Sequence, residues 1–125
     1  MFKTCPHCGR EWPGREDLLR DPEVIISGYQ LHPVDPLKGF YLFQHGRPGC
    51  DTSFAVQTEH FLDLASPSAY ECMIFGEEDC KGHCLVVENL GACDAPCRGA
   101  AFREVLGIIA DLLARARNER PGSDA

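Results

Sequence analysis

The first half of the chain alternates short apolar runs with stretches that favour turns. Three runs rich in β-branched and aromatic residues are bounded by Pro, Gly and Asp, as strands usually are. They are VIISGYQL (24–31), FYLFQH (40–45) and TSFAVQ (52–57). Because consecutive strands joined by short loops usually pair with each other, the pattern predicts an antiparallel three-stranded meander. The stretch TEHFLDLA (58–65) then predicts a short helix with Thr58 as its N-cap.

Helical periodicity is strongest near the C-terminal end. Apolar residues recur there with the α-helical period: Phe102, Val105, Leu106, Ile109, Leu112, Leu113 and Ala116. Asp94 suits the N-cap and Pro96 the first turn, so we expect a helix over 96–117 that packs across the meander. Ala101 and Ile108 widen its apolar face, which leaves open a homodimer formed through this helix.

The pattern as a whole predicts an α+β protein with a single metal-organised domain over residues 1–117. A small antiparallel three-stranded unit (1–65) leads into a Cys-rich irregular segment (66–97) and then into the long C-terminal helix (96–117). The segment 66–97 is rich in Gly, Pro and Cys and shows little periodicity, so it needs an organising element other than an apolar core. Residues 118–125 are expected to form a flexible tail.

Net charge and cysteine content limit the kinds of partner and chemistry that the protein can have. The formal net charge of −7 argues against nucleic acid as the main partner, because phosphate backbones are bound by clustered Lys and Arg. The chain starts without the apolar run of a secretory signal and contains no stretch of about 20 apolar residues that could cross a membrane. We therefore expect a cytoplasmic location. In a reducing compartment, eight cysteines in 125 residues point to metal binding or catalysis rather than to structural disulfides.

The motif Cys-Pro-His-Cys at positions 5–8 has two interpretations. As a redox pair it resembles the active-site tetrad of bacterial periplasmic disulfide oxidases of the thioredoxin fold. That resemblance implies a strand before the motif and a helix after it. Only four residues precede Cys5, and Gly9, Pro13 and Gly14 interrupt any helix that would follow. The context therefore disfavours the redox interpretation.

As a metal motif, the sequence C-P-x-C-G at positions 5–9 resembles the first knuckle of zinc ribbons and related small zinc modules. The resemblance implies a ligand role for Cys5 and Cys8 and makes the predicted β unit zinc-ribbon-like. Gly9 allows the backbone to curl so that its N–H groups point at sulfur. Zinc takes four ligands in a tetrahedron, so two more must come from elsewhere.

His45 and Cys50 are the best completing pair, because one ends a predicted strand and the other precedes the next. Their spacing is H-x₄-C, which departs from the C-x-x-C of a ribbon but still completes an ordinary Cys₃His set. The alternative is a surface histidine and a buried thiol. His7, between the first two cysteines, is expected to be exposed or to lie just outside the ligand set.

A second cluster follows in the Cys-rich segment. It consists of two C-x₃-C pairs separated by eight residues: Cys80, Cys84, Cys93 and Cys97. Four thiolates so close in sequence can close around one ion at little entropic cost. Zinc is the first expectation and an iron–sulfur cluster the second, while a disulfide or redox arrangement and plain buried cysteines remain alternatives. Cys72 is expected to be a core thiol, and it is a reserve ligand for this site together with His83.

These patterns favour a small cytoplasmic zinc-binding protein with two zinc ions. It would act as a non-catalytic binding, adaptor or regulatory module with a protein partner. No nucleophile elbow, phosphate-binding glycine loop or H-E-x-x-H motif occurs in the sequence. Enzymatic activity is therefore disfavoured but left undecided. The alternative is a redox-responsive thiol protein or an iron–sulfur electron carrier that uses the second cluster.

Overall fold

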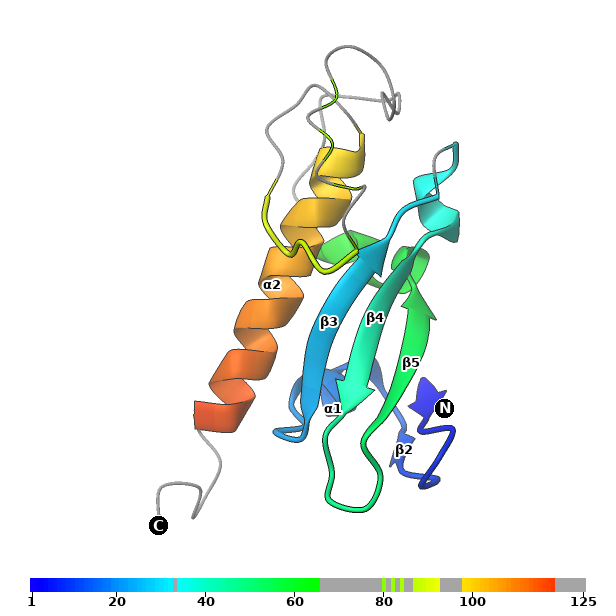
Figure 1. Cartoon of the computed structure of the whole chain (residues 1–125), viewed down its shortest axis with the longest axis vertical. Coiled ribbons are helices and arrows are strands. Elements are labelled where there is room, and N and C mark those ends of the chain that lie inside the picture. The colour runs from blue at the N-terminus through cyan, green and yellow to red at the C-terminus, as the bar shows by residue number, and fades with distance from the viewer. Residues whose placement is uncertain are drawn as a thin grey trace.

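The structure, a computed structural model, describes residues 1–32, 34–65, 80, 82, 84, 87–92 and 98–118 (Figure 1). A three-stranded antiparallel sheet forms its centre, in the order β3 (Val24–Gln30), β4 (Phe40–His45) and β5 (Thr52–Gln57). The last two strands have the bounds expected from the sequence, and β3 ends one residue earlier. Together with the long C-terminal helix, this meander makes the fold α+β.

Strand alternation gives the sheet one buried face. On β4 the side chains of Tyr41, Phe43 and His45 are buried, whereas those of Phe40, Leu42 and Gln44 are half-buried on the other face. The period of two is what an antiparallel strand with one covered face requires. It also places His45, the last residue of β4, on the same face as the core.

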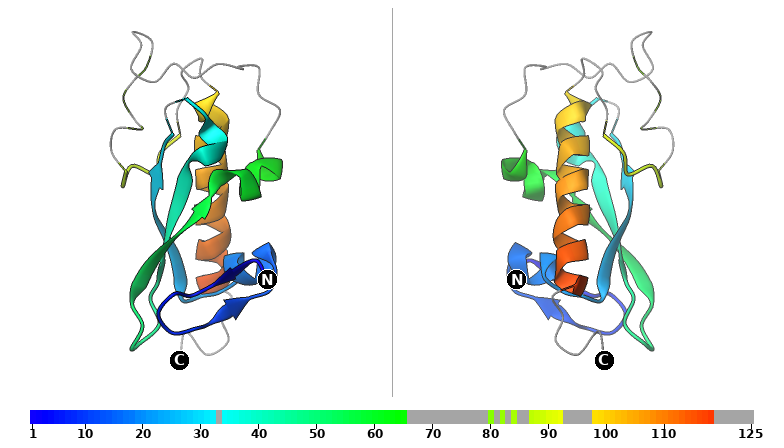
Figure 2. Two further views of the ribbon diagram at one scale, coloured as in Figure 1. Left: turned by 90° about the vertical axis from the view of Figure 1, so that its right-hand side faces the viewer. Right: turned by 90° about the vertical axis from the view of Figure 1, so that its left-hand side faces the viewer.

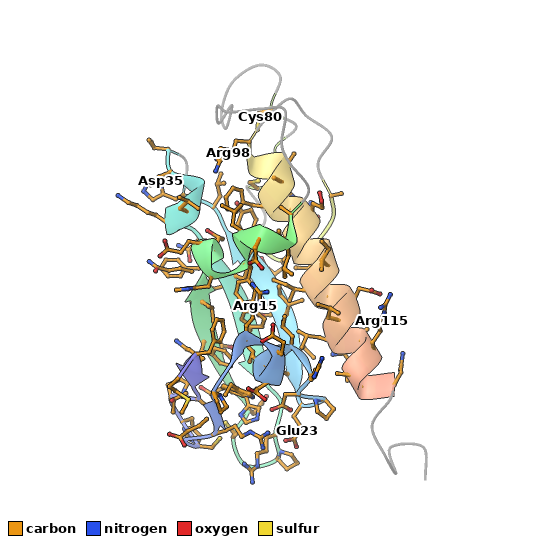
Figure 3. All side chains as sticks on the ribbon, turned by 180° about the vertical axis from the view of Figure 1, so that it is seen from behind. Arg15, Glu23, Asp35, Cys80, Arg98 and Arg115 are labelled. Atoms are coloured by element: carbon orange, nitrogen blue, oxygen red, sulfur yellow. The ribbon has the colours of Figure 1, made fainter. Side chains whose placement is uncertain are left out.

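Three helical elements cover this buried face (Figures 2 and 3). They are α1 (Arg15–Leu19), the 3₁₀ helix η2 (Thr58–Leu64) and α2 (Gly99–Asn118). A second short 3₁₀ helix, η1 (Pro36–Lys38), lies in the β3–β4 connection. The element at 58–64 is therefore 3₁₀ rather than α, and its N-cap is Gln57, while Thr58 is buried inside it.

The apolar stripe of α2 faces the sheet as its periodicity predicts. Phe102, Val105, Leu106, Ile109 and Leu113 are all buried. The helix begins at Gly99 and ends at Asn118, whereas the sequence led us to expect 96–117; residues 96 and 97 lie outside the described part. Among the described residues, no helix combines the length and apolarity needed to cross a bilayer.

Two polar contacts tie α2 to the rest of the core. The Tyr41 hydroxyl donates to the carbonyl oxygen of Phe102 at 2.6 Å. Arg103 is buried, and its guanidinium donates to the carbonyl oxygens of Asn89 and Gly91 and lies 5.7 Å from the centre of the Tyr29 ring. The helix therefore holds the 89–91 segment as well as the sheet.

Gly28 admits a close backbone approach at a bulge in β3. The β3–β4 register shifts between Ile26 and Gly28, and the carbonyl oxygen of Val87 accepts a hydrogen bond from the backbone N–H of Tyr29 at 2.9 Å. A Cβ at position 28 would lie 2.8 Å from both the carbonyl oxygen and a side-chain methyl of Val87. Glycine is therefore required at position 28 for Val87 to lie against β3.

A second, smaller sheet lies at one end of the molecule (Figure 2). It consists of β1 (Lys3–Thr4) and β2 (Glu11–Trp12), with Lys3 opposite Trp12. The Trp12 side chain is fully buried and stacks on Phe54 of β5, with ring centres 5.3 Å apart. Trp12 thus fixes the N-terminal hairpin against the larger sheet.

Candidate metal centre

The loop between β1 and β2 forms the predicted knuckle. The backbone N–H of Gly9 donates to the carbonyl oxygen of Cys5 at 3.1 Å, and the N–H of Cys5 donates to that of Arg10 at 2.7 Å. Gly9 has φ of +79°, a conformation that glycine adopts without steric cost. This tight turn brings Cys5 and Cys8 onto one side, with Cys5 buried and Cys8 exposed. His7, between them, is exposed.

The connection from β4 to β5 supplies the other two residues. Cys50 lies in a turn in which its backbone N–H donates to the carbonyl oxygen of Arg47 at 2.8 Å. Gly49 and Asp51 on either side have positive φ values, +85° and +46°, and the Asp51 carboxylate accepts a hydrogen bond from the Gln44 side chain. The turn therefore folds back so that Cys50 lies near His45.

The four predicted ligands of the first site converge. One ligand atom from each of Cys5, Cys8, His45 and Cys50 lies within 4.8 Å of the other three. The Sγ atoms of Cys5 and Cys50 are 3.5 Å apart, and Sγ of Cys8 is 3.5 Å from Nδ1 of His45. Zinc bonds of about 2.3 Å to sulfur and 2.0 Å to nitrogen imply ligand–ligand edges of roughly 3.5–3.8 Å in a tetrahedron. This Cys/His cluster can therefore hold a metal ion.

The thiols of the cluster change one another's pKa. Burial acts to raise the pKa of Cys5. Hydrogen bonds from the backbone N–H groups of Cys8 and His7 and from the side chains of His45 and Cys50 outweigh burial, and the pKa is lowered to about 6. Desolvation and the neighbouring sulfurs of Cys5 and Cys8 raise the pKa of Cys50 to about 11. One thiolate thus forms easily and the next is resisted, a conflict that a bound cation relieves.

Behind the cluster, the His45 ring lies beside Trp12, Asp21 and Glu23. The Trp12 ring meets the His45 ring edge-on, with centres 5.2 Å apart. The indole Nε1–H of Trp12 donates to Oδ2 of the buried Asp21 at 2.9 Å, and Oδ1 of Asp21 accepts the backbone N–H of Glu23 at 2.9 Å. Carboxylate oxygens of Asp21 and Glu23 lie within 4.8 Å of a ring nitrogen of His45.

Sequence reasoning missed these three supporting residues, Trp12, Asp21 and Glu23. No periodicity or spacing marks them, because they precede the first strand of the meander. Strand pairing brings Asp21 and Glu23 close to His45, since the backbone N–H of Gly46 donates to the carbonyl oxygen of Glu23 at 2.7 Å and Val24 pairs with His45. Trp12 reaches His45 from the β1–β2 hairpin. Only the β3–β4 register and the docking of this hairpin could have revealed the proximity.

The second predicted cluster lies largely outside the described residues. Cys93 and Cys97 fall there, as do the reserve ligands Cys72 and His83. Cys80 and Cys84 are described and half-buried. A guanidinium nitrogen of Arg103 lies 3.7 Å from Sγ of Cys84. A metal or iron–sulfur site at this cluster stays a prediction.

Comparisons with known proteins return no counterpart: no family model, no curated protein and no solved structure matches the chain.

Proposed function

We propose that the protein binds a structural zinc ion through Cys5, Cys8, His45 and Cys50 and acts as a non-catalytic binding or regulatory module. The observation that carries the proposal is the convergence of four ligand atoms within 4.8 Å from two separate parts of the chain. Three thiolates and an imidazole are a common structural zinc set. On this proposal the N-terminal hairpin and the β4–β5 turn form a zinc-ribbon-like unit joined by the ion.

The donor set favours zinc over harder metals. Thiolate sulfur is a soft ligand that selects zinc, copper(I) or iron over magnesium and calcium. The short ligand–ligand edges of 3.5 Å suit a closed tetrahedral site. A closed site leaves no position for substrate or water, which is why we propose a structural rather than a catalytic ion.

Metal analysis of ligand variants tests the site. We expect Cys5→Ser and Cys50→Ser each to lose the same single equivalent of zinc, and the double variant to lose no more than either one. His7→Ala is the matched control, because this exposed histidine lies between two ligands and is expected to keep full zinc content. If Cys5→Ser and Cys50→Ser both retained all of their metal, the site as assigned would be wrong.

Cobalt substitution tests whether the ion is structural. A tetrahedral Cys₃His site loaded with Co²⁺ is expected to give the intense visible d–d bands of tetrahedral thiolate coordination. Addition of azide or cyanide should leave the bands unchanged, because no coordination position is open. Bands that shift with azide at low concentration would favour a catalytic ion instead.

The single tryptophan, Trp12, lies against His45. Its fluorescence should therefore change when the cluster binds the metal ion.

We propose that the partner of the module is another protein, in a reducing, cytoplasmic setting. The support is the face of the sheet turned away from α2, where Ile25 is 39% exposed and Leu42 and Ala55 are half-buried. Light scattering of the zinc-loaded protein distinguishes a second copy from a different partner. A dimer that α2 variants dissociate would favour the homodimer.

A metal content near two equivalents would support a second ion at Cys80, Cys84, Cys93 and Cys97, and iron with sulfide would favour the electron carrier.

A further inference from the structure

His45 uses only one of its two ring nitrogens toward the cysteines. Its Nδ1 lies 3.5 Å from Sγ of Cys8. Its Nε2 is buried and has no hydrogen-bond partner among the described residues, in a side chain with no exposed surface. When a neutral imidazole binds a metal through one nitrogen, the other carries the proton and needs an acceptor.

Two carboxylates lie close to the His45 ring. Oxygens of Asp21 and Glu23 are within 4.8 Å of a His45 nitrogen and of each other. Asp21 is fixed, because Trp12 Nε1–H and the backbone N–H of Glu23 hold its two oxygens at 2.9 Å each. The Glu23 side chain is half-buried, and no hydrogen bond from another described residue holds its carboxylate. Figure 3 shows Glu23 at the end of the molecule where β1 and β2 lie.

We propose that Glu23 is the positioning residue of the metal centre and accepts the Nε2–H of His45 when Nδ1 binds the ion. This inference rests on the proposed zinc site. A rotation of the Glu23 side chain is sufficient, because its backbone is already anchored beside His45 by the hydrogen bond from Gly46. The contact fixes the tautomer and orientation of the ring and makes Nδ1 a stronger ligand, as carboxylate partners of zinc-bound histidines do.

The competing use of the same residues is a second cation held by Asp21, Glu23 and His45. Nδ1 of His45 belongs to the cysteine cluster, so such a cation would need both ring nitrogens to be deprotonated. A neutral imidazole offers one lone pair in the ring plane and one N–H. A hydrogen bond to Glu23 satisfies the buried nitrogen without that demand.

Zinc competition with a chromogenic chelator tests the role of Glu23 in the full chain. We expect Glu23→Ala to lower zinc affinity by about 10- to 100-fold, the range for loss of such a partner. Glu23→Gln keeps an acceptor oxygen and should recover part of the loss. Glu88→Ala is the charge-matched control, because Glu88 is exposed and follows Val87, which lies beside the opposite end of β3. Its affinity should equal that of the natural protein.

A long-range ¹H–¹⁵N spectrum of the zinc-loaded protein supplies a readout that a general structural role would not move. We expect a protected Nε2–H resonance for His45 in the natural protein and its loss through fast exchange in Glu23→Ala. Weaker zinc binding with an unchanged His45 resonance would overturn the inference. So would affinity in Glu23→Ala within twofold of the natural protein.

The same experiment separates failure of the inference from failure of the proposed function. If the natural protein binds no zinc, both are wrong. If it binds one equivalent and the Glu23 variants match it, only the role of Glu23 is wrong. The natural protein could instead bind one more equivalent of zinc, lost in Glu23→Ala but kept in Glu88→Ala. In that case Glu23 holds a second cation and does not accept a hydrogen bond from His45.

Discussion

The two ends of the central sheet are held by different kinds of contact. Near Tyr29 and Tyr41, aromatic rings and the N-terminal half of α2 pack together, with Phe61 and Phe102 fully buried. Near His45, the four candidate ligand atoms of the Cys/His cluster lie together beside a few hydrogen bonds, and the proposed ion would join them. Apolar packing adds up over many weak contacts, whereas a metal site depends on four specific atoms. The first region should tolerate conservative change, and the second should fail when one ligand is lost.

Trp12 joins the two regions. One face of its ring stacks on Phe54, which in turn stacks on Phe43 in the core, and its edge meets His45. Its indole N–H anchors Asp21. The contacts therefore change along the sheet, from apolar packing near Tyr41 to the Cys/His cluster near His45.

The largest effect on stability is expected from Phe43→Ala. Phe43 is fully buried and stacks on Phe54 with ring centres 5.6 Å apart. Removing a buried phenylalanine costs about 3–5 kcal/mol. The loss should be equal with zinc and with chelator in denaturant unfolding, because the contact belongs to the packed region. Ile25→Ala, on the open face, is the control and should cost less than about 1 kcal/mol. A Phe43 effect that depends strongly on zinc would show that the two regions are not separable.

Removing zinc should rank next and act locally. Zinc at a thousandfold excess over its Kd stabilises the folded state by about 4 kcal/mol. After chelation, amide hydrogen exchange is expected to speed up in residues 5–12 and 46–51, while β4 and α2 keep most of their protection. Cys8→Ser should show this faster exchange both with and without added zinc. Equal loss of protection along α2 would contradict a local role for the ion.

A smaller effect is expected from Tyr41→Phe. Its hydroxyl is buried and donates to Phe102 at the start of α2, and burial raises its pKa far above the ordinary tyrosine value. Losing this bond should cost about 0.5–1.5 kcal/mol in urea unfolding and should leave zinc content unchanged. Altered zinc affinity in this variant would mean that the contact between Tyr41 and Phe102 affects the Cys/His cluster at the other end of the sheet.

The smallest effect is expected from Asp63→Asn, which removes the bidentate pair between Asp63 and Arg15, at 2.5 and 3.0 Å. The Asp63 side chain is 66% exposed, so solvent screens the pair and the cost should stay below about 1 kcal/mol. Hydrogen bonding to Arg15 lowers the pKa of Asp63 below its ordinary 3.8.

The sign of the pH dependence follows from that direction. The stabilisation is present above about pH 4 and is lost as pH falls through the lowered pKa. Unfolding at pH 7 and pH 2.5 in low salt checks this, and the difference between Asp63→Asn and the natural protein should be smaller at the lower pH. Asp111→Asn, which removes the i,i+4 pair with Arg115, is the matched control. An effect of Asp63→Asn that was as large at pH 2.5 as at pH 7 would rule out the ion pair as its cause.

The parts of the fold that the sequence predicted well are those with strong local signals. The runs 40–45 and 52–57 became β4 and β5 with unchanged bounds, because alternation and flanking turn residues mark both. The helix at 58–64 adopted 3₁₀ geometry, which apolar periodicity does not distinguish over so few residues. The two-residue strands β1 and β2 were not predicted, because runs of that length carry no periodic signal.

The ligand set of the first site followed from chemistry rather than from periodicity. Cys5 and Cys8 with Gly9 define a knuckle, and His45 and Cys50 flank a predicted turn. Each pair is local, so sequence spacing is informative. That the two pairs meet depends on how the hairpin docks on the sheet, which the burial of Trp12 against Phe54 decides.

The sequence by itself determined the three strands of the meander, the long helix and the two halves of the Cys/His cluster, because all of these are short-range patterns. Tertiary structure alone decided that Arg103 is buried between Tyr29 and segment 89–91. It also decided that Asp21 and Glu23 lie behind His45. Both depend on strand register and helix docking, and these are fixed by the sum of many packing contacts across the whole core rather than by neighbours along the chain.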